Sequence, residues 1–595
     1  MIASLATALV GPLAGPELRR ATGRRWPYVV RLLVATAAAI AVLGVGCWTW
    51  GGVRLDPRHL PFAELRGGLT ALEGMALLAA LVLAPAVLAG SLADEKQSGA
   101  MALLLTTRVG PREIVAGRLA GKLGQIGPAL LAGLPAVAWL GGYAGLGPLA
   151  LATLAALPAA VAFGAGGLAV AASAVARRGR DATLGVFALE VVFFVGRAVA
   201  WTAGPTWAVM LGWLAALDPF SGLIALTWGD DPGPALASTL AWVGLGLAGV
   251  ALASWRLRPA CLAAVGRPGR RRSGRRWRVP PVGERPMRWK ELYIERAGAL
   301  GWFGTALGLL LVAYLVLGSL AGAGLIAWGR RIGRDPSLER LGGELLRGLI
   351  VGPAGYFSWL IEWAIGLRAA VAIAGERDGG TWDGLLTSPL TGTEIVLAKL
   401  RGSLHALRWL IAAALFAWAV ALASGELDPA QFAVMLATLL SVGVFMAAVG
   451  VRASLGARTA THAMAITLGV WLGALGASSG LGAALLAIGA LMAASVAFAY
   501  DVAAPGRLPL GAGTLATLWG LVTLLPYAAA AAMIASEARI RFDRIAGRIP
   551  GGSVELAVDT VRPGHPGPPP PGVARTESTP VTAPAPVLDP LAAED

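Results

Sequence analysis

The stretch Leu69–Ala93 reads LTALEGMALLAALVLAPAVLAGSLA, and its only charged residue is Glu73. About 20 apolar residues are enough for a helix to cross the hydrocarbon core of a bilayer, which is roughly 30 Å thick. The run is continuous in leucine, alanine and valine, whereas a strand of an outer-membrane barrel alternates with a period of two residues. The stretch therefore predicts a transmembrane helix.

The remainder of the 595-residue chain has the same character. Of its residues 56% are hydrophobic and 14% are charged, with a mean hydropathy of +0.68. Soluble domains have about 25% charged residues, so the composition predicts an all-α polytopic membrane protein with about twelve spans. The predicted spans lie near 28–49, 69–93, 119–142, 147–175, 183–203, 235–255, 299–328, 349–374, 404–424, 429–451, 463–478 and 513–535. Residues 205–229 and 481–499 are apolar but interrupted or short, and are interpreted as re-entrant or interfacial.

The distribution of lysine and arginine predicts the orientation in a cell inner membrane. Cytoplasmic loops carry an excess of both residues. The loops 204–234 and 425–430 contain neither and are expected outside. Residues 94–122 and 256–290 are rich in them and are expected in the cytoplasm, together with both termini. The exception is 329–348, an expected outer loop with five arginines.

Four regions are predicted along the chain: a first six-span half at 1–255, a basic linker at 256–285, a second half at 286–545, and a proline-rich tail at 546–595. The tail cannot build a core and is expected to be disordered. The linker is interpreted as a topology signal that is attracted to anionic lipid headgroups. It has no aromatic platform, so membrane lipid and not nucleic acid is the expected partner.

An internal repeat relates the two halves. A shift of 281 positions superimposes ADEKQSGAMALLLTTRVGPREIVAGRLAG (Ala93–Gly121) on AGERDGGTWDGLLTSPLTGTEIVLAKLRG (Ala374–Gly402). The same shift, without a gap, places Ser173 on Ser454 two spans later. Identical pairs include Glu95/Glu376, Gly99/Gly380, Leu104/Leu385, Leu105/Leu386, Glu113/Glu394 and, at a shift of 274, Glu17/Glu291. The repeat predicts two homologous six-helix halves.

The repeated segment follows the second span of each half, on the expected cytoplasmic side. It passes from a charged cluster through a glycine to a Leu-Leu-Thr turn. Short helices that present leucines between charged flanks suit docking in a groove of a partner protein. In the alternative interpretation these leucines pack back onto the bundle, and the glutamates only cap a short helix.

The second copy, ERDGGTWDGLLTSPLTGTEIVLAK (Glu376–Lys399), closely resembles the signature that follows the second span of ABC-2-type permeases. The first copy departs from this pattern at Ala100, which stands in place of Thr381, and at Arg108, which stands in place of Pro389. The Pro-x4-Glu-Leu stretch ahead of each half is similar to the amphipathic elbow helix of the same family.

The resemblance implies the membrane-spanning subunit of an ATP-driven transporter, with an exporter expected. In that family the repeated segment is the coupling helix, which fits a cleft on a separate ATP-hydrolysing subunit. Two copies of that subunit are expected here. The residues implied in ATPase docking are Glu95, Gly99, Leu104, Leu105, Glu376, Gly380, Thr381, Leu385, Leu386 and Pro389.

Catalysis by the chain itself is not predicted. The sequence has no GxxxxGK[ST] loop to hold ATP phosphates, and Gly117–Lys122 (GRLAGK) is one residue short of that spacing. ATP hydrolysis is therefore expected in the partner. His405 and His462 have no cysteine or carboxylate at ligand spacing, so no metal and no cofactor are expected.

An uncompensated charge inside a membrane span is expensive, and three charged residues of the predicted spans are candidates for a functional role. Glu190 and Arg197 are seven positions apart and nearly on one helical face, and Glu362 lies in the span 349–374. We expect all three to face a translocation pathway. The alternative is that Glu190 and Arg197 pair with each other, or that the arginine reaches the outer surface.

Two other functions are open at this point. An ion-coupled secondary transporter usually carries several ionisable groups near the midplane, and few are evident here. A non-transporting membrane scaffold would use the basic linker and the tail, and it would leave the repeated segment unexplained.

Overall fold

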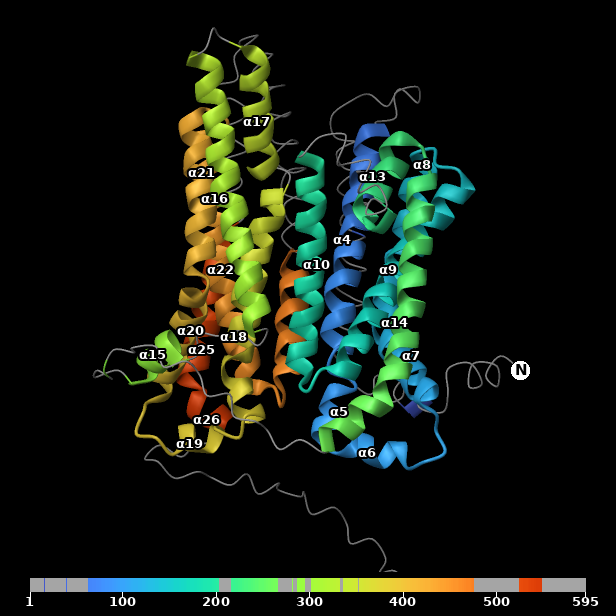
Figure 1. Cartoon of the computed structure of the whole chain (residues 1–595), viewed down its shortest axis with the longest axis vertical. Coiled ribbons are helices and arrows are strands. Elements are labelled where there is room, and N and C mark those ends of the chain that lie inside the picture. Colours follow the sequence, from blue (N-terminus) through green and yellow to red (C-terminus); the bar gives the residue numbers. More distant parts are fainter. Residues whose placement is uncertain are drawn as a thin grey trace, which may run out of the picture.

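The computed structural model describes residues 62–202, 216–265, 286–294, 301–331, 335–350, 353–475 and 524–547, with a few isolated positions. All regular elements in these ranges are helical. The long helices stand side by side in two groups, one from each half of the sequence, and α10 (Gly179–Thr202) lies between the groups (Figure 1). The prediction of an all-α polytopic membrane protein is confirmed.

The first-half group is built on two long helices, α9 (Pro148–Val175) and α14 (Gly233–Val265). They approach closely because glycines meet where they pack: a Cβ on Gly167 would lie 2.6 Å from the carbonyl oxygen of Gly246. Small residues permit such an approach between membrane helices, which associate through packing. The other elements of this group are α4 (Phe62–Leu88), α5 (Ala93–Gln97), α6 (Ala100–Leu105), α7 (Pro111–Leu131), α8 (Leu134–Tyr143) and α13 (Pro219–Gly229).

The second-half group centres on the contact between α18 (Pro353–Asp378) and α22 (Pro429–Gly456). A glycine again allows the close approach, since a Cβ on Gly450 would lie 2.6 Å from the carbonyl oxygen of Gly366. The other elements are α15 (Pro286–Trp289), η1 (Lys290–Ile294), α16 (Gly301–Arg331), α17 (Pro336–Ile350), α19 (Trp382–Leu386), α20 (Gly392–Ala406), α21 (Arg408–Ser424), the helix Ala460–Leu475, α25 (Leu525–Ile540) and α26 (Phe542–Ala546).

Within the described ranges, six helices are long and apolar enough to cross a membrane, and two bent pairs would raise the number to eight. The pairs are α7 with α8, bent by 41°, and α20 with α21, bent by 52°. These eight coincide with eight of the predicted spans. Of the others, 183–203 is α10, 463–478 is the shorter helix Ala460–Leu475, 513–535 is described only from residue 524, and 28–49 lies outside the described residues. Twelve spans therefore stay a prediction.

The interrupted piece 205–229 is described from residue 216, where α13 is a helix of 11 residues. Asp218 caps it, because its carboxylate accepts hydrogen bonds from the backbone N–H groups of Phe220 and Ser221. At 1.5 Å per residue the helix is about 16 Å long, roughly half of the hydrocarbon core. This length suits a re-entrant or interfacial piece. The similar piece 481–499 lies outside the described residues.

The arginine-rich segment 329–348 is largely helical rather than a loop. The amphipathic helix α17 packs against α16 at the end of the molecule opposite α19 (Figure 1). A Cβ on Gly342 would lie 2.6 Å from the carbonyl oxygen of Gly322. Arg347 forms an ion pair with Glu426 at 2.8 Å. Arg340 and Arg347 lie on this amphipathic helix, whereas Arg330 and Arg331 are in the last turn of α16.

The expected linker at 256–285 begins as a continuation of a span. Helix α14 runs on to Val265, so its last turns carry Arg256 and Arg258. The guanidinium carbon of Arg256 lies 4.4 Å from the centroid of the neighbouring Trp255 ring. The helix therefore extends ten residues past the boundary that the charge pattern indicated.

The two halves meet where α10 contacts the helix Ala460–Leu475. A Cβ on Gly179 would lie 2.5 Å from Oγ1 of Thr461. Gly179 and Ala460 are themselves related by the shift of 281 positions. Along α10, Val191 and Val195 pack into the second-half core. Equivalent helices of the two groups thus lie at the boundary between them.

Candidate functional site

The two copies of the repeated segment lie at the same end of the bundle (Figure 1). Helices α5 and α6 occupy it in the first half, and the end of α18 with α19 occupies it in the second. Each copy connects two long helices, α4 to α7 and α18 to α20. A force applied to α6 or α19 would therefore act on helices that enter the membrane.

A glycine with positive φ precedes each short helix. The φ angle is +79° at Gly99 and +69° at Gly380. This left-handed region costs a residue with a Cβ about 1–2 kcal/mol. The backbone turn therefore accounts for the repeated glycine, because glycine adopts a positive φ angle without strain.

A serine from α9 holds the start of the first copy, and a serine from α22 holds the start of the second. The hydroxyl oxygen of Ser173 accepts hydrogen bonds from the backbone N–H groups of Leu92 and Ala93, at 3.1 and 3.0 Å. Ser454 accepts the equivalent bonds from Ile373 and Ala374, at 2.9 and 2.7 Å. These N–H groups are buried, so the serines satisfy donors that would otherwise be costly.

A basic residue makes the second attachment. Lys96 donates to the carbonyl oxygens of Ala174 and Ala176, at 2.8 and 2.7 Å, where α9 ends. Arg377 donates to the carbonyl oxygen of Ala457, at 2.7 Å, where α22 ends. Cations are favoured at helix C-termini, which carry partial negative charge. Matching contacts thus fasten the first copy to α9 and the second copy to α22.

An ion cluster connects the second copy to α20 and to η1. The elements α15 and η1 together form the elbow, the second Pro-x4-Glu-Leu stretch. The Lys399 ammonium lies 3.0 Å from the Glu376 carboxylate and 2.5 Å from the Glu291 carboxylate. Lys290 approaches Glu376 to 2.6 Å, and the Thr381 hydroxyl also donates to Glu376. Lys399 is fully buried. Three separate elements, α18, α20 and η1, therefore meet on this lysine and on the glutamate that it neutralises.

The first copy has a smaller version of this cluster. Glu95 pairs with Arg118, and their side chains are 21% and 12% exposed. Glu17, the counterpart of Glu291, lies outside the described residues. In both copies an acidic residue is followed 23 positions later by a basic one, and this repeated spacing could have indicated the ion pair in the sequence. Their pairing was not foreseen, because the partners belong to different helices.

The structure shows how exposed the repeated leucines are. Leu385 and Leu386 are 7% and 3% exposed, and Leu104 and Leu105 are half-buried. Leu385 shares a buried cluster with Phe542 of α26. The burial of the second-copy leucines agrees with the alternative interpretation, in which they pack back onto the bundle, and docking of the four leucines on an ATPase stays a prediction.

The exposed side chains of the two segments differ. Leu103 on α6 is 72% exposed, and its counterpart on α19 is Gly384. Thr387, which caps the C-terminus of α19, and Pro389, two residues later, are exposed as well. A single exposed leucine is ordinary on a protein surface, so what makes Leu103 a candidate contact for a partner is its place in the repeated segment.

The repeated Glu-Ile-Val begins the next helix in each copy. The Glu394 carboxylate accepts a hydrogen bond from the Thr391 N–H at 3.0 Å, and the Thr391 hydroxyl accepts one from the Glu394 N–H at 3.3 Å. Glu113 accepts from the Gly110 N–H at 3.2 Å in the first copy. These capping contacts give the repeated glutamate a structural role.

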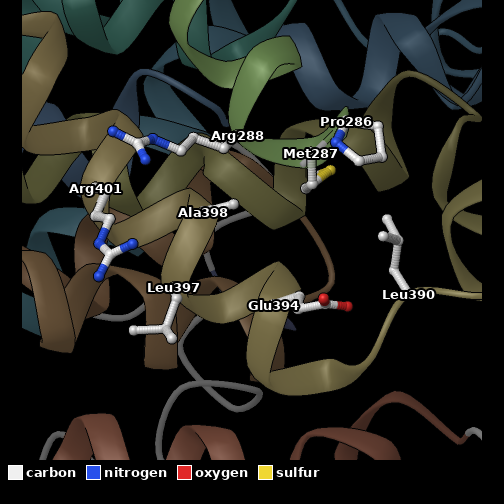
Figure 2. Close-up of a pocket in the computed structure, with 8 residues that line it drawn as sticks. All are labelled: Pro286, Met287, Arg288, Leu390, Glu394, Leu397, Ala398 and Arg401. Atoms are coloured by element: carbon white, nitrogen blue, oxygen red, sulfur yellow. The ribbon is translucent and has the colours of Figure 1, made fainter. Parts of the chain in front are cut away.

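A pocket of about 330 Å³ lies between the elbow and the start of α20 (Figure 2). Figure 2 shows two guanidinium groups toward one end of it, a carboxylate toward the other, and apolar side chains between them. It is lined by Pro286, Met287, Arg288, Leu390, Glu394, Leu397, Ala398 and Arg401.

Arg197 does not pair with Glu190. Its guanidinium lies 3.4 Å from the Asp218 carboxylate and donates to the Ser221 hydroxyl at 3.3 Å. The arginine thus fastens α13 to α10, and its place in a translocation pathway stays a prediction. Asp218 lies outside the predicted spans, so the sequence pattern did not single it out as the partner.

Glu190 of α10 and Glu362 of α18 are both buried, and these two helices are in contact. In each carboxylate one oxygen, Oε1, has no hydrogen-bond partner among the described residues. Trp471 of the helix Ala460–Leu475 donates to Glu362. The Trp363 ring centroid lies 5.1 Å from that of Trp471 and 6.3 Å from that of Phe187, one turn before Glu190. An aromatic cluster at the boundary between the halves therefore lies beside both carboxylates.

Comparison with known families gives one match. Residues 356–499 match the family described as ABC-2 family transporter protein. The matched range begins in α18 and includes α19, α20, α21, α22 and the helix Ala460–Leu475. No curated protein matches the chain. The family match confirms the resemblance noted for Glu376–Lys399, and residues 356–499 are similar to membrane permeases of the ABC-2 type.

Proposed function

We propose that this chain is the membrane-spanning subunit of an ABC exporter and that it couples to two copies of a separate ATPase through α6 and α19. The observation that carries the proposal is the matching attachment of both short helices at one end of the bundle. This end is proposed to face the cytoplasm, with both chain termini on the same side of the inner membrane. The two halves are proposed to be homologous and pseudo-symmetric.

The proposed transmission follows from the contacts of the second copy. Movement of α19 acts directly on α18. It reaches α22 through Ser454 and Arg377, and it reaches α20 through the ion pair of Glu376 with Lys399. Buried contacts of this kind move as a unit because packed interiors deform little. Closure of an ATPase against α19 would therefore displace three spans together.

The ATPase contact is proposed to use the exposed residues of the segment. Leu103 is the exposed leucine of α6, whereas α19 presents Asp383, Gly384 and Thr387. We therefore expect the apolar part of the contact to come from α6.

Replacing Leu103 with glutamate should weaken binding of the ATPase. Burial of one leucine contributes about 1.5–3 kcal/mol, which corresponds to a loss of roughly 10-fold to 150-fold in affinity. The measurement is co-purification of the chain with candidate ABC-type ATPases, together with ATP hydrolysis by the complex in lipid.

Leu341→Glu is the matched control. Leu341 is also an exposed leucine, but it lies on α17 at the opposite end of the bundle (Figure 1). This variant should retain the complex. If the Leu103 variant retains wild-type affinity while the protein is correctly inserted, α6 is not a docking element and the coupling proposal loses its support.

The translocation pathway is proposed to run along the boundary between the halves, beside Glu190 and Glu362. A buried carboxylate oxygen without a partner is costly, and such groups in membrane helices commonly mark a substrate route. Aromatic rings add faces that can bind apolar or cationic substrates.

A cysteine at position 190 should become accessible during turnover. In a chain with Cys47 and Cys261 replaced by serine, Glu190→Cys should react slowly with a small water-soluble maleimide at rest, because the position is buried. Its labelling rate should rise during ATP hydrolysis, whereas Ala169→Cys, buried in α9, should stay unreactive. Equal labelling with and without ATP would place the pathway elsewhere.

Ion-coupled transport is the competing function, since buried carboxylates could also carry protons or cations. It predicts uptake or efflux driven by an ion gradient in proteoliposomes that contain this chain alone. The exporter proposal predicts no transport under those conditions.

A further inference from the structure

The pocket in Figure 2 lies beside the elbow and has charges that the coupling contacts do not use. Arg288 is on α15, Arg401 is on α20, and both side chains are exposed. Neither forms an ion pair within the described ranges, although lysines and arginines nearby do. The pocket thus presents two available cationic groups from two different elements.

The Glu394 carboxylate in the same pocket is already engaged. It accepts hydrogen bonds from the Thr391 N–H and hydroxyl, at 3.0 and 3.1 Å. It also lies toward the end of the pocket away from the two guanidinium groups (Figure 2). The arginine end is therefore suited to an anion.

The walls between the charges are apolar. Met287, Leu390, Leu397 and Ala398 line them. Figure 1 shows α15 beside α20, between the long helices and the layer that contains α19. If the long helices cross the membrane, an elbow at this level is expected to meet lipid headgroups on one side and acyl chains on the other. A ligand that joins an anionic group to an apolar part would satisfy both kinds of wall.

We propose that this pocket binds the phosphate group of a membrane phospholipid, with Arg288 and Arg401 at the phosphate and the glycerol and upper acyl chain along Leu397. Guanidinium groups suit phosphate because they can donate two parallel hydrogen bonds to its oxygens. The pocket volume is within the ordinary range for small-molecule sites.

Lipid binding would act on the coupling machinery. The same elbow continues into η1, where Lys290 and Glu291 join the ion cluster with Glu376 and Lys399. A phosphate held between α15 and α20 would keep the elbow against α20, and would thereby stabilise the cluster. Lipid binding to this pocket does not require that α6 binds an ATPase, so the two proposals can be tested separately.

The test uses the purified full-length chain in detergent. Phosphatidylglycerol, phosphatidylethanolamine, diacylglycerol and inorganic phosphate are titrated separately, and bound lipid and melting temperature are measured. Both phospholipids should bind and raise the melting temperature. Diacylglycerol lacks the phosphate and inorganic phosphate lacks the acyl chain, so each should bind at least tenfold more weakly than phosphatidylglycerol.

Replacing arginine with glutamine should weaken phosphatidylglycerol binding by about fivefold for Arg288 and by a similar factor for Arg401. Arg112→Gln is the matched control, because Arg112 is an exposed arginine in the first turn of α7, the counterpart of α20. It should leave binding unchanged. The variant with lysine at both positions should bind more tightly than the double glutamine variant, because it keeps the charge, and more weakly than the wild type, because lysine cannot donate the two parallel hydrogen bonds.

Leu397→Gln should weaken phosphatidylglycerol binding without changing that of inorganic phosphate. Unchanged lipid binding by the double glutamine variant would overturn the proposal. Inorganic phosphate that binds as tightly as the phospholipid would show a soluble-anion site instead. Diacylglycerol that binds equally well would show a purely apolar one.

Discussion

Replacing Lys399 with methionine is expected to destabilise the protein by about 3–5 kcal/mol, because one cation neutralises two buried carboxylates. Lys399 is fully buried, and it lies 2.5 Å from Glu291 and 3.0 Å from Glu376. Removing it takes a buried cation from beside Glu291, whereas Glu376 keeps its contact with Lys290 at 2.6 Å. The melting temperature of the purified chain in detergent should fall, and any coupling to an ATPase should fall with it.

Two comparisons isolate the cause. Arg118→Met removes the equivalent base from the first copy, where the ion pair is more exposed, and should cost less. Adding Glu291→Gln to the Lys399 variant removes the charge of the other carboxylate that Lys399 contacts and should recover part of the loss. If Lys399→Met melts as the wild type does, the cluster does not hold these three elements together.

Replacing Gly249 with valine is expected to have the second large effect, because it separates α9 from α14. A Cβ at this position would lie 2.4 Å from the carbonyl carbon of Gly167 and 2.5 Å from its oxygen. These are backbone atoms, which cannot rotate away as a side chain can. Overpacking typically costs 1–3 kcal/mol, and the backbone clash indicates the upper end of that range, about 3 kcal/mol. The readouts are melting temperature and the monodisperse fraction on size exclusion.

Gly244→Val is the control for the same helix. A Cβ on Gly244 meets no atom within 4 Å, so the substitution adds the same side chain without a clash. It should change stability little. Equal losses for the two variants would mean that valine harms α14 for another reason, and that the glycine contact with α9 is not the cause.

The repeat in the sequence located the candidate site and most of its special positions. Gly99 and Gly380 were matched by the repeat, and the structure adds the reason for a glycine at both positions, which is a positive φ angle. Ser173 and Ser454 matched at the same shift, and both hold the start of the segment. What the repeat did not indicate was the partner of each residue, which lies 80 positions away in the chain.

The hydrophobic runs by themselves determined the class of protein, because an apolar stretch of membrane length has few alternatives to a helix. They also determined where most spans lie. The tertiary structure alone decided which side of a short helix is buried. Helix α19 has five residues, too few for a periodic pattern to define a face, so Leu385 looked as free as Leu103 until α26 was seen to pack near it. It also decided that Arg197 pairs with Asp218 and that Lys399 is shared by Glu291 and Glu376. Such pairings depend on how separate helices approach one another in space, and no local pattern of residues encodes that approach.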